Sequence, residues 1–372
     1  MELAVTLGYW SGSPSTARPG AEVASGPAQS LALARRAEEV GCSTAWVAEA
    51  YGSDAPSVLA WLAAQTTRIG LGSAVMQVPA RSAAATAMTA ATLDTLSGGR
   101  FRLGLGVSGP QVSEGWHGVR FDAPLARTRE YVDVVRLALS RRPVAYDGEH
   151  LRLPLPDGPG VPLRLALCPP RERIPVYLAA VGPRNVELAG QVADGWLPVF
   201  FSPEHAQEAL AALARGRGRR DPAAGSDGFD VAPTVPLVVT ADGPAPARAD
   251  AAEAASGPVR AHAALYLGGM GSREQNFYRR LAERMGYGAE AARVQEHFLA
   301  GRHREAAAAV PRAFLQATCL IGPAPALRDR LQALAGVGVT TVCAAPMAPA
   351  LEQRLADLGV LADALDAAGT GA

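Results

Sequence analysis

The chain has 372 residues, 49% of them hydrophobic, which allows either two domains or one large barrel with insertions around a sizeable core. Its 35 basic residues balance 35 acidic ones, and all of the basic residues are arginine. Zero net charge argues against a nucleic-acid or anionic-membrane partner. The absence of lysine excludes Schiff-base lysine chemistry and a Walker-type nucleotide site.

The spacing of the cysteines and histidines indicates the redox compartment and whether a metal site is expected. Four widely spaced cysteines form no CxxC pair, which is typical of a reducing compartment. None of the six histidines has the HxH, HxxxH or HExxH spacing of a metal site. The sequence shows neither a signal-peptide pattern nor an apolar run of about 18 residues. We therefore expect a cytoplasmic protein without a metal, whose partner is a small-molecule or peptide substrate or another copy of itself.

Short runs rich in Val, Leu and Ile alternate with longer stretches at helical spacing, which predicts β-α units around a parallel sheet. Eight strands are expected, at 3–8, 45–49, 69–76, 101–108, 176–181, 195–201, 231–239 and 340–345. Helices are expected between them, among them 29–40, which ends at Gly41. This pattern predicts an α/β fold built from βα repeats, with which one closed barrel is compatible.

Two stretches are longer than the connections of a minimal barrel require, and we expect them to form insertions on its rim. Residues 147–175 are proline-rich, with a possible hairpin in GEHLRLPLP, and residues 244–311 are mainly helical. Segments 215–228 and 242–255 indicate surface helix ends or mobile loops rather than domain linkers. We expect a single domain over residues 1–372.

Catalytic groups of a parallel barrel collect where its strands end. The second strand ends in WVAEAY, which lifts Glu49 to the rim as a candidate proton donor or cofactor ligand. Alternatively, Glu49 pairs with a rim arginine and only supports the barrel. The third strand ends in small residues that allow a flat ligand to approach the backbone.

The fourth strand runs into GLGVSG, which matches a Rossmann G-x-G-x-x-G only superficially. Pro110 follows it, and we expect SEGWHG to extend a loop rather than to open a helix. In this loop His117 is a candidate for chemistry, although packing of the loop would explain it equally well.

The fifth strand leads through Gly182, Pro183 and Arg184 into a helix at 185–192. Backbone N–H groups at that helix N-terminus, with Arg184, could cradle a phosphate. A tight turn with a solvent-facing arginine is the alternative.

These segments together resemble the luciferase-like, F420-dependent oxidoreductases. The resemblance is carried by WVAEAYGSDA (46–55), by TLDTLSGGRFRLGLGVSGPQ (92–111) and by PVYLAAVGPRNVELAGQVADGW (175–196). It continues through ALYLGGMGSREQNFYRRLAERMGYG (264–288) and LIGPAPALRDRLQALAGVGVTTV (320–342). The segments follow the order expected of the family over nearly the whole chain.

The resemblance implies a (β/α)8 TIM barrel with a cofactor site at its C-terminal face, and coenzyme F420 as the cofactor. It implies a non-prolyl cis peptide bond in the third strand, which by position falls between Ala74 and Val75. It makes Glu49 the counterpart of the family's acidic residue; some relatives have a histidine next, where this chain has Ala50. Residues implied in cofactor binding are Ala74, Val75, Gln77, Ser108, Gly109, Gln111, Gly182, Pro183 and Arg184.

From the resemblance we expect hydride transfer between a reduced deazaflavin and an activated C=C or C=N bond, or from an alcohol in reverse. Glu49 or His117 would handle the proton. Ala50 and the missing lysines argue against the family's sugar-phosphate dehydrogenase branch.

Two alternatives to this activity stay open. The first is an FMN-dependent monooxygenase or reductase on the same barrel, and the second is a non-catalytic barrel that binds a flavin-like ligand or a partner protein. Family barrels usually pair through flank helices, so a homodimer is expected. The apolar helix at 81–96 is a candidate interface, unless it packs only on its own barrel.

Overall fold

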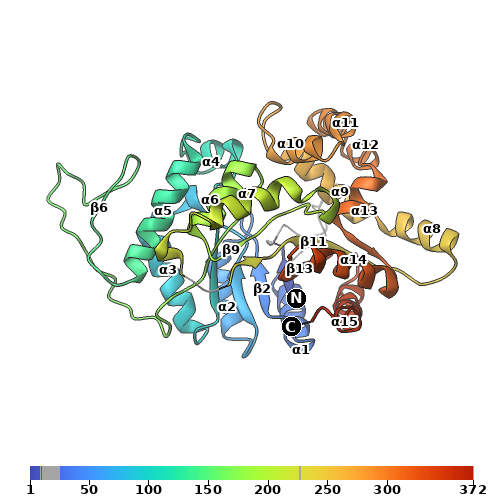
Figure 1. Cartoon of the computed structure of the whole chain (residues 1–372), viewed down its shortest axis with the longest axis horizontal. Coiled ribbons are helices and arrows are strands. Elements are labelled where there is room, and N and C mark those ends of the chain that lie inside the picture. The colour runs from blue at the N-terminus through green and yellow to red at the C-terminus, as the bar shows by residue number, and fades with distance from the viewer. Residues whose placement is uncertain (9, 11–25, 226–227, 372) are drawn as a thin grey trace.

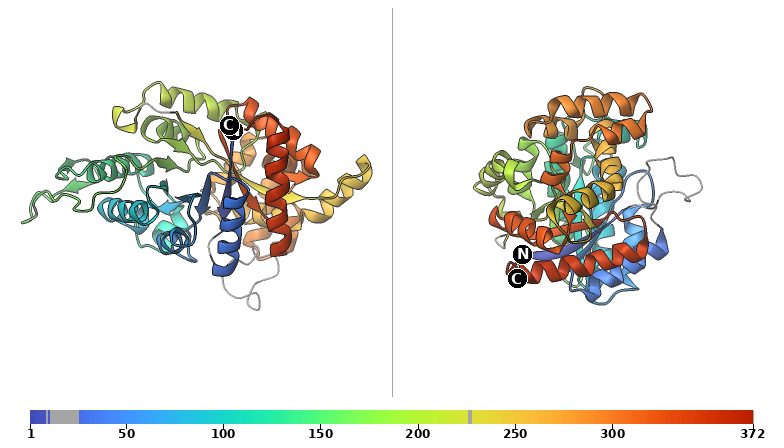
Figure 2. Two further views of the ribbon diagram at one scale, coloured as in Figure 1. Left: turned by 90° about the horizontal axis from the view of Figure 1, so that it is seen from below. Right: turned by 90° about the vertical axis from the view of Figure 1, so that its right-hand side faces the viewer.

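The computed structural model describes residues 1–8, 10, 26–225 and 228–371, and its strands form a parallel sheet surrounded by helices (Figures 1 and 2). All eight predicted strands are present. They are β1 (Glu2–Leu7), β2 (Thr44–Val47), β3 (Gly70–Ser73) with β4 (Met76–Gln77), β5 (Phe101–Gly106), β8 (Val176–Leu178), β9 (Gly195–Trp196), β10 (Asp230–Val231) with β11 (Thr234–Val239), and β13 (Thr341–Pro346). The predicted α/β architecture is confirmed.

Pairing in the sheet curls it into a barrel. Strand β1 pairs with β2 on one side and with β13 on the other. Strand β10 pairs with β9, and β11, which continues the same run, pairs with β13. The two ends of the sheet therefore meet at residues 230–239. Strand β12 (Leu320–Gly322), which the sequence did not predict, adds to the far end of β11.

Helices cover the outside of the sheet because alternate strand residues point outward. In β1 the apolar Leu3, Val5 and Leu7 belong to the core shared with the helices, whereas Ala4 belongs to a separate cluster inside the barrel. The covering helices are α1 (Pro27–Glu39), α2 (Ala55–Ala63), α3 (Ala83–Leu96), α5 (Pro124–Leu139), α6 (Pro183–Val192), α7 (Gln207–Arg217), α14 (Ala324–Gly336) and α15 (Leu351–Ala367). Within the described residues, no helix is long and apolar enough to span a membrane.

Large aromatic rings fill the barrel interior. The rings of Trp46 and Tyr177 meet edge to face with centroids 5.0 Å apart. Glycine makes room for them, since a Cβ at Gly72 would lie 2.3 Å from the Trp46 ring and one at Gly195 2.2 Å from Tyr177. The interior is thus a packed core and not a pore.

The two stretches that exceed a minimal barrel form a hairpin and a group of helices. The hairpin forms from β6 (Tyr146–Asp147) and β7 (Arg152–Leu153) and belongs to an arm, residues 146–167, that projects from the body (Figure 1). The second insertion is helical, as predicted, and has its own core around Phe200 and Phe314. It comprises α8 (Ala245–Ala255), α9 (Gly257–Ala264), the π-helix η5 (Leu265–Gly269), α10 (Phe277–Arg284), α11 (Gly288–Leu299) and α12 (His303–Ala308), followed by α13 (Arg312–Thr318).

Glu38 on α1 fixes the turn that leads into β3. Its Oε1 accepts hydrogen bonds from the backbone N–H groups of Thr67, Arg68 and Ile69 at 2.9, 2.6 and 2.9 Å. Partial burial raises the pKa of Glu38, but these three donors and the Arg68 charge outweigh it, so that the pKa is lowered from 4.5.

We expect Glu38→Gln to reduce the free energy of unfolding by about 1 kcal/mol near neutral pH, after allowance for solvent screening. Because the folded-state pKa lies below the unfolded value, this stabilisation is present above about pH 4.5 and is lost as the pH falls through the folded-state pKa. Urea unfolding of both proteins at neutral and acidic pH checks this. A difference that persists unchanged in acid would contradict the assignment.

Candidate functional site

Small side chains form the top layer of the barrel interior, where the strands end. Ala74, Val75 and Ala179 are half-buried on top of the aromatic core. Gly106 lies beneath them, and a Cβ there would come within 2.5 Å of Val75 Cγ2. The cis peptide bond predicted between Ala74 and Val75 is present. These four residues, called the floor below, put only small aliphatic side chains at the top of the barrel interior.

Gln77 connects three loops beside the floor. Its Nε2 donates hydrogen bonds to the carbonyl oxygens of Glu49 and Ala50, at 3.1 and 2.9 Å. Its Oε1 lies 3.0 Å from Nε2 of His117. Because both amide hydrogens are used, Oε1 must accept, and His117 Nε2 must carry the hydrogen. That tautomer leaves Nδ1 of the half-buried His117 ring as a proton-accepting atom when the ring is neutral.

Glu49 is held by an ion pair and a helix terminus. Its Oε1 lies 2.7 Å from Arg81 Nη1, and its Oε2 accepts the N–H of Ala55 at 3.0 Å, in the first turn of α2. The Glu49 side chain is only 7% exposed. The pairing with a rim arginine that the sequence left open is therefore present. Arg81 itself, at the end of the third strand's run, was not assigned a role from the sequence.

The loop after β5 corrects one prediction. Ser108 adopts a positive φ of 61°, and Gly109 then caps α4 (Pro110–Gly115). The expectation that this segment forms a loop is wrong, because proline is favoured in the first turn of a helix, where its missing N–H costs nothing. The helix is short, and His117 lies just beyond its end.

Gln111 on α4 ties the barrel to the helical insertion. Its Nε2 donates to the carbonyl oxygen of Gly271 at 2.8 Å, and its Oε1 accepts the Gly271 N–H at 2.9 Å. Both ends of the Gln111 amide are thus engaged by the loop after η5. The amide holds that loop over the end of β5.

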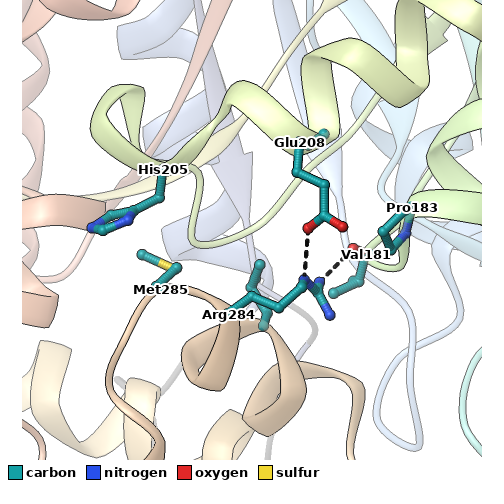
Figure 3. Close-up of a pocket in the computed structure, with 8 residues that line it drawn as sticks. Val181, Pro183, His205, Glu208, Arg284 and Met285 are labelled. Carbon is teal, nitrogen blue, oxygen red and sulfur yellow. Dashed lines mark hydrogen bonds and ion pairs between the residues drawn. The ribbon is translucent and has the colours of Figure 1, made fainter.

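The turn after β8 places Gly182 as the cap of α6 and Pro183 in its first turn. Arg184 is exposed, in keeping with the solvent-facing alternative. Beside this turn lies a cavity of about 100 Å³, shown in Figure 3. It is lined by Val181, Pro183, His205, Glu208, Ala209, Leu281, Arg284 and Met285.

Arg284 of α10 crosses this cavity to the barrel rim (Figure 3). Its Nη2 donates to the carbonyl oxygen of Val181 at 3.2 Å, and its Nε lies 3.4 Å from Glu208 Oε2. No feature of the sequence signalled this contact, because the two residues of the hydrogen bond are 103 positions apart. Arg284 and Gln111 thus connect the helical insertion to the barrel at two points near the strand ends.

The structure therefore brings the predicted residues into two groups. Glu49, Gln77 and His117 are linked by hydrogen bonds at one edge of the floor. Gly182, Pro183 and Arg184 lie at the end of β8, the strand whose extension carries Ala179. The described residues hold no cluster of three or more His, Cys, Asp or Glu side chains suited to a metal.

Comparison with known proteins gives a consistent result. A family model described as luciferase-like monooxygenase matches residues 5–341. A Mycobacterium tuberculosis protein provisionally named a coenzyme F420-dependent oxidoreductase is 41% identical over 345 residues, which is 91% of this chain and 93% of that protein. The 5,10-methylenetetrahydromethanopterin reductase of Methanolobus tindarius is 33% identical over 192 residues, 51% of this chain and 56% of its own.

Solved structures share the fold. The F420-dependent tetrahydromethanopterin reductase of Methanopyrus kandleri superposes with a TM-score of 0.74 at 23% identity, over 97% of each chain. A riboflavin lyase structure with a modified FMN superposes with a TM-score of 0.73 at 12% identity, covering 100% of this chain and 92% of that one. At such low identities these superpositions show only a shared fold, which is the barrel described above.

Proposed function

The chain belongs to the luciferase-like monooxygenase family, and on that premise we propose that it is a coenzyme F420-dependent oxidoreductase. It transfers a hydride between the reduced deazaflavin and an activated C=C or C=N bond of a small organic or peptide substrate, or takes one from an alcohol in reverse. The 41% identity across nearly the whole chain to a relative named for F420 favours this cofactor.

The single structural observation that carries the proposal is the floor. No side chain on it is larger than valine, and a Cβ at Gly106 would already collide with Val75. A tricyclic ring needs such a flat, apolar seat. When bound, the deazaflavin supplies hydride chemistry at a carbon that replaces the reactive flavin nitrogen.

The residues around the floor would hold the rest of the cofactor. Ser108 and Gly109 would form one wall, and Arg184, exposed in the turn after Gly182 and Pro183, would supply a backbone N–H group and a cation for a phosphate. Gln77 and Gln111 fix the loops on either side through their amide groups. Ala74 and Val75 would lie against the ring.

His117 is the residue that we assign to the proton. Its Nε2 is committed to Gln77, so that Nδ1 is the atom that exchanges a proton with the substrate. Both Glu49 oxygens are engaged, by Arg81 and by the N–H of Ala55. Glu49 therefore acts as a positioning residue, which holds Arg81 and the start of α2 beside the floor.

The proposal is tested by anaerobic turnover with reduced F420 and a panel of enones, imines and ketones. We expect at least one acceptor to restore the visible absorbance of the oxidised cofactor, with deuterium from labelled F420 appearing on the product carbon. Oxygen-dependent turnover with reduced FMN, and none with F420, would contradict it. Binding of F420 without turnover of any acceptor or alcohol would favour a non-catalytic barrel.

A further inference from the structure

Two aromatic side chains are exposed on loops at the strand ends. Tyr51, in the loop after β2, is 51% exposed, and Trp116, at the end of α4, is 66% exposed. Every other phenylalanine, tyrosine and tryptophan of the described residues is buried or half-buried. Aromatic rings contribute strongly to binding, because they present a large apolar area on a stiff side chain. Two such rings exposed at one site indicate a surface that another molecule covers.

A single side-chain amide brings the two loops to one site. Gln77 Nε2 donates to the carbonyl oxygen of Ala50, the residue before Tyr51, at 2.9 Å. Gln77 Oε1 lies 3.0 Å from Nε2 of His117, the residue after Trp116. The two loops are therefore bound at opposite ends of one amide. Tyr51 and Trp116 thus belong to the same part of the rim as His117 Nδ1, the atom assigned to the proton.

Hydrogen bonds close the Trp116 loop on itself. The N–H groups of Trp116 and His117 both donate to the carbonyl oxygen of Val112, each at 3.1 Å. Ser113 Oγ donates to the carbonyl oxygen of Val119 at 2.7 Å, and the Val119 N–H donates to the carbonyl oxygen of Ser113 at 2.9 Å. A ligand that binds against Trp116 therefore loses little free energy in ordering this loop.

The loop of Tyr51 is anchored on both sides of that residue. Before it, Gln77 Nε2 binds the carbonyl oxygen of Ala50. After it, the Ser53 hydroxyl accepts the N–H of Trp10 at 2.9 Å. The Tyr51 ring is thus presented from a backbone that is already fixed, as the Trp116 ring is.

The charges of loops 48–54 and 113–121 are nearly balanced. Each of their three carboxylates already has a partner: Glu49 has the Arg81 guanidinium at 2.7 Å, Asp54 the N–H of Ser57 at 2.9 Å, and Glu114 the N–H of Phe121 at 3.0 Å. Arg120 is the remaining charged side chain of the two loops, and it is exposed. Since neither sign of charge predominates around the two rings, an uncharged ligand fits them best.

We propose that Tyr51 and Trp116 bind the aromatic part of an uncharged substrate and so determine which substrates react, an inference that rests on the proposed function. The bond that accepts the hydride lies over the floor near His117, and the aromatic group attached to it extends to the two exposed rings. Aromatic rings attract one another in offset or edge-to-face contact, beyond the gain from burying their area. The substrate class is an aromatic enone or imine.

The test compares two ketones of similar size on protein loaded with oxidised F420, or with oxidised FMN if FMN binds more tightly. Benzalacetone has a benzene ring on its enone, and its cyclohexyl analogue has a saturated ring at the same place. Because an oxidised cofactor has no hydride to give, calorimetric titration measures binding alone. We expect the wild type to bind benzalacetone about 3- to 10-fold more tightly. Trp116→Ala and Tyr51→Ala should each lose most of this preference.

Three further variants are the controls. Trp116→Phe and Tyr51→Phe keep an aromatic ring and should retain the preference. Val119→Ala shortens a 39% exposed side chain of the Trp116 loop that has no ring, and it should retain the preference as well. Circular dichroism verifies that each variant is folded.

A wild type that binds both ketones alike, or neither, would overturn the proposal, and so would a preference that survives in both alanine variants. Tighter binding of the para-carboxylate derivative of benzalacetone would also overturn it, since that result would assign an anionic substrate to Arg120. The proposed function is judged separately. It fails when no acceptor or alcohol is turned over, whatever the two ketones show, and an active reductase without the preference contradicts only the role of the two rings.

Discussion

Replacing His117 with glutamine is expected to lower kcat by roughly 10²- to 10⁴-fold, the usual contribution of a positioned proton donor. Glutamine can keep the contact with Gln77 Oε1 that His117 Nε2 makes at 3.0 Å, and it removes the ring nitrogen that exchanges the proton. Binding of F420 should change little. Steady-state kinetics over a pH range, with a cofactor titration alongside, measure both quantities.

Glu49→Gln is the matched variant for this prediction. It keeps an oxygen for Arg81 or for the N–H of Ala55 but loses the carboxylate charge. We expect Glu49→Gln to bind F420 more weakly and to be less stable than the wild type, while its kcat falls much less than that of His117→Gln. The assignment of the proton to His117 fails if kcat falls further in Glu49→Gln than in His117→Gln.

A large side chain on the floor is expected to weaken F420 binding strongly. Ala179→Phe places a ring where the cofactor ring is to lie, since Ala179 is half-buried at the top of the barrel interior. The Kd for F420 should rise by about 100-fold or more, the equivalent of losing roughly 3 kcal/mol of binding. Fluorescence titration measures the Kd.

Ala179→Gly is the control for the filled floor, because it leaves the seat open and should bind F420 much as the wild type does. Thermal unfolding of both variants separates a blocked seat from a disrupted barrel, since overpacking a core costs about 1 to 3 kcal/mol. A folded Ala179→Phe protein that binds F420 as tightly as the wild type would place the cofactor elsewhere.

The βα repeat was predictable from local signals in the sequence, whereas the closed barrel was expected from the resemblance to the family. Each of the eight expected strands is an apolar run bounded by turn residues, and buried parallel strands have that composition. Strand β12 was missed because three residues, Leu320–Gly322, carry too little pattern. Helix α4 was not predicted because Pro110 suits a loop as well as the first turn of a helix.

The contacts within the site were less predictable because they join distant parts of the chain. Gln77 and His117 are 40 positions apart, and Gln111 and Gly271 are 160 apart. Composition and periodicity say nothing about such pairs. The ion pair of Glu49 with Arg81 was foreseen only as one of two possibilities, and the charge pattern gave no means of choosing between them.

The identity of the cofactor is tested most directly by parallel titrations of the purified apoprotein with F420 and with FMN. Both ligands present a tricyclic ring and a phosphate, so the floor and the turn at Gly182 alone do not separate them. The similarity to a relative named for F420 predicts a lower Kd for F420 than for FMN. A tighter Kd for FMN would contradict F420 as the cofactor and favour a flavin-dependent monooxygenase or reductase.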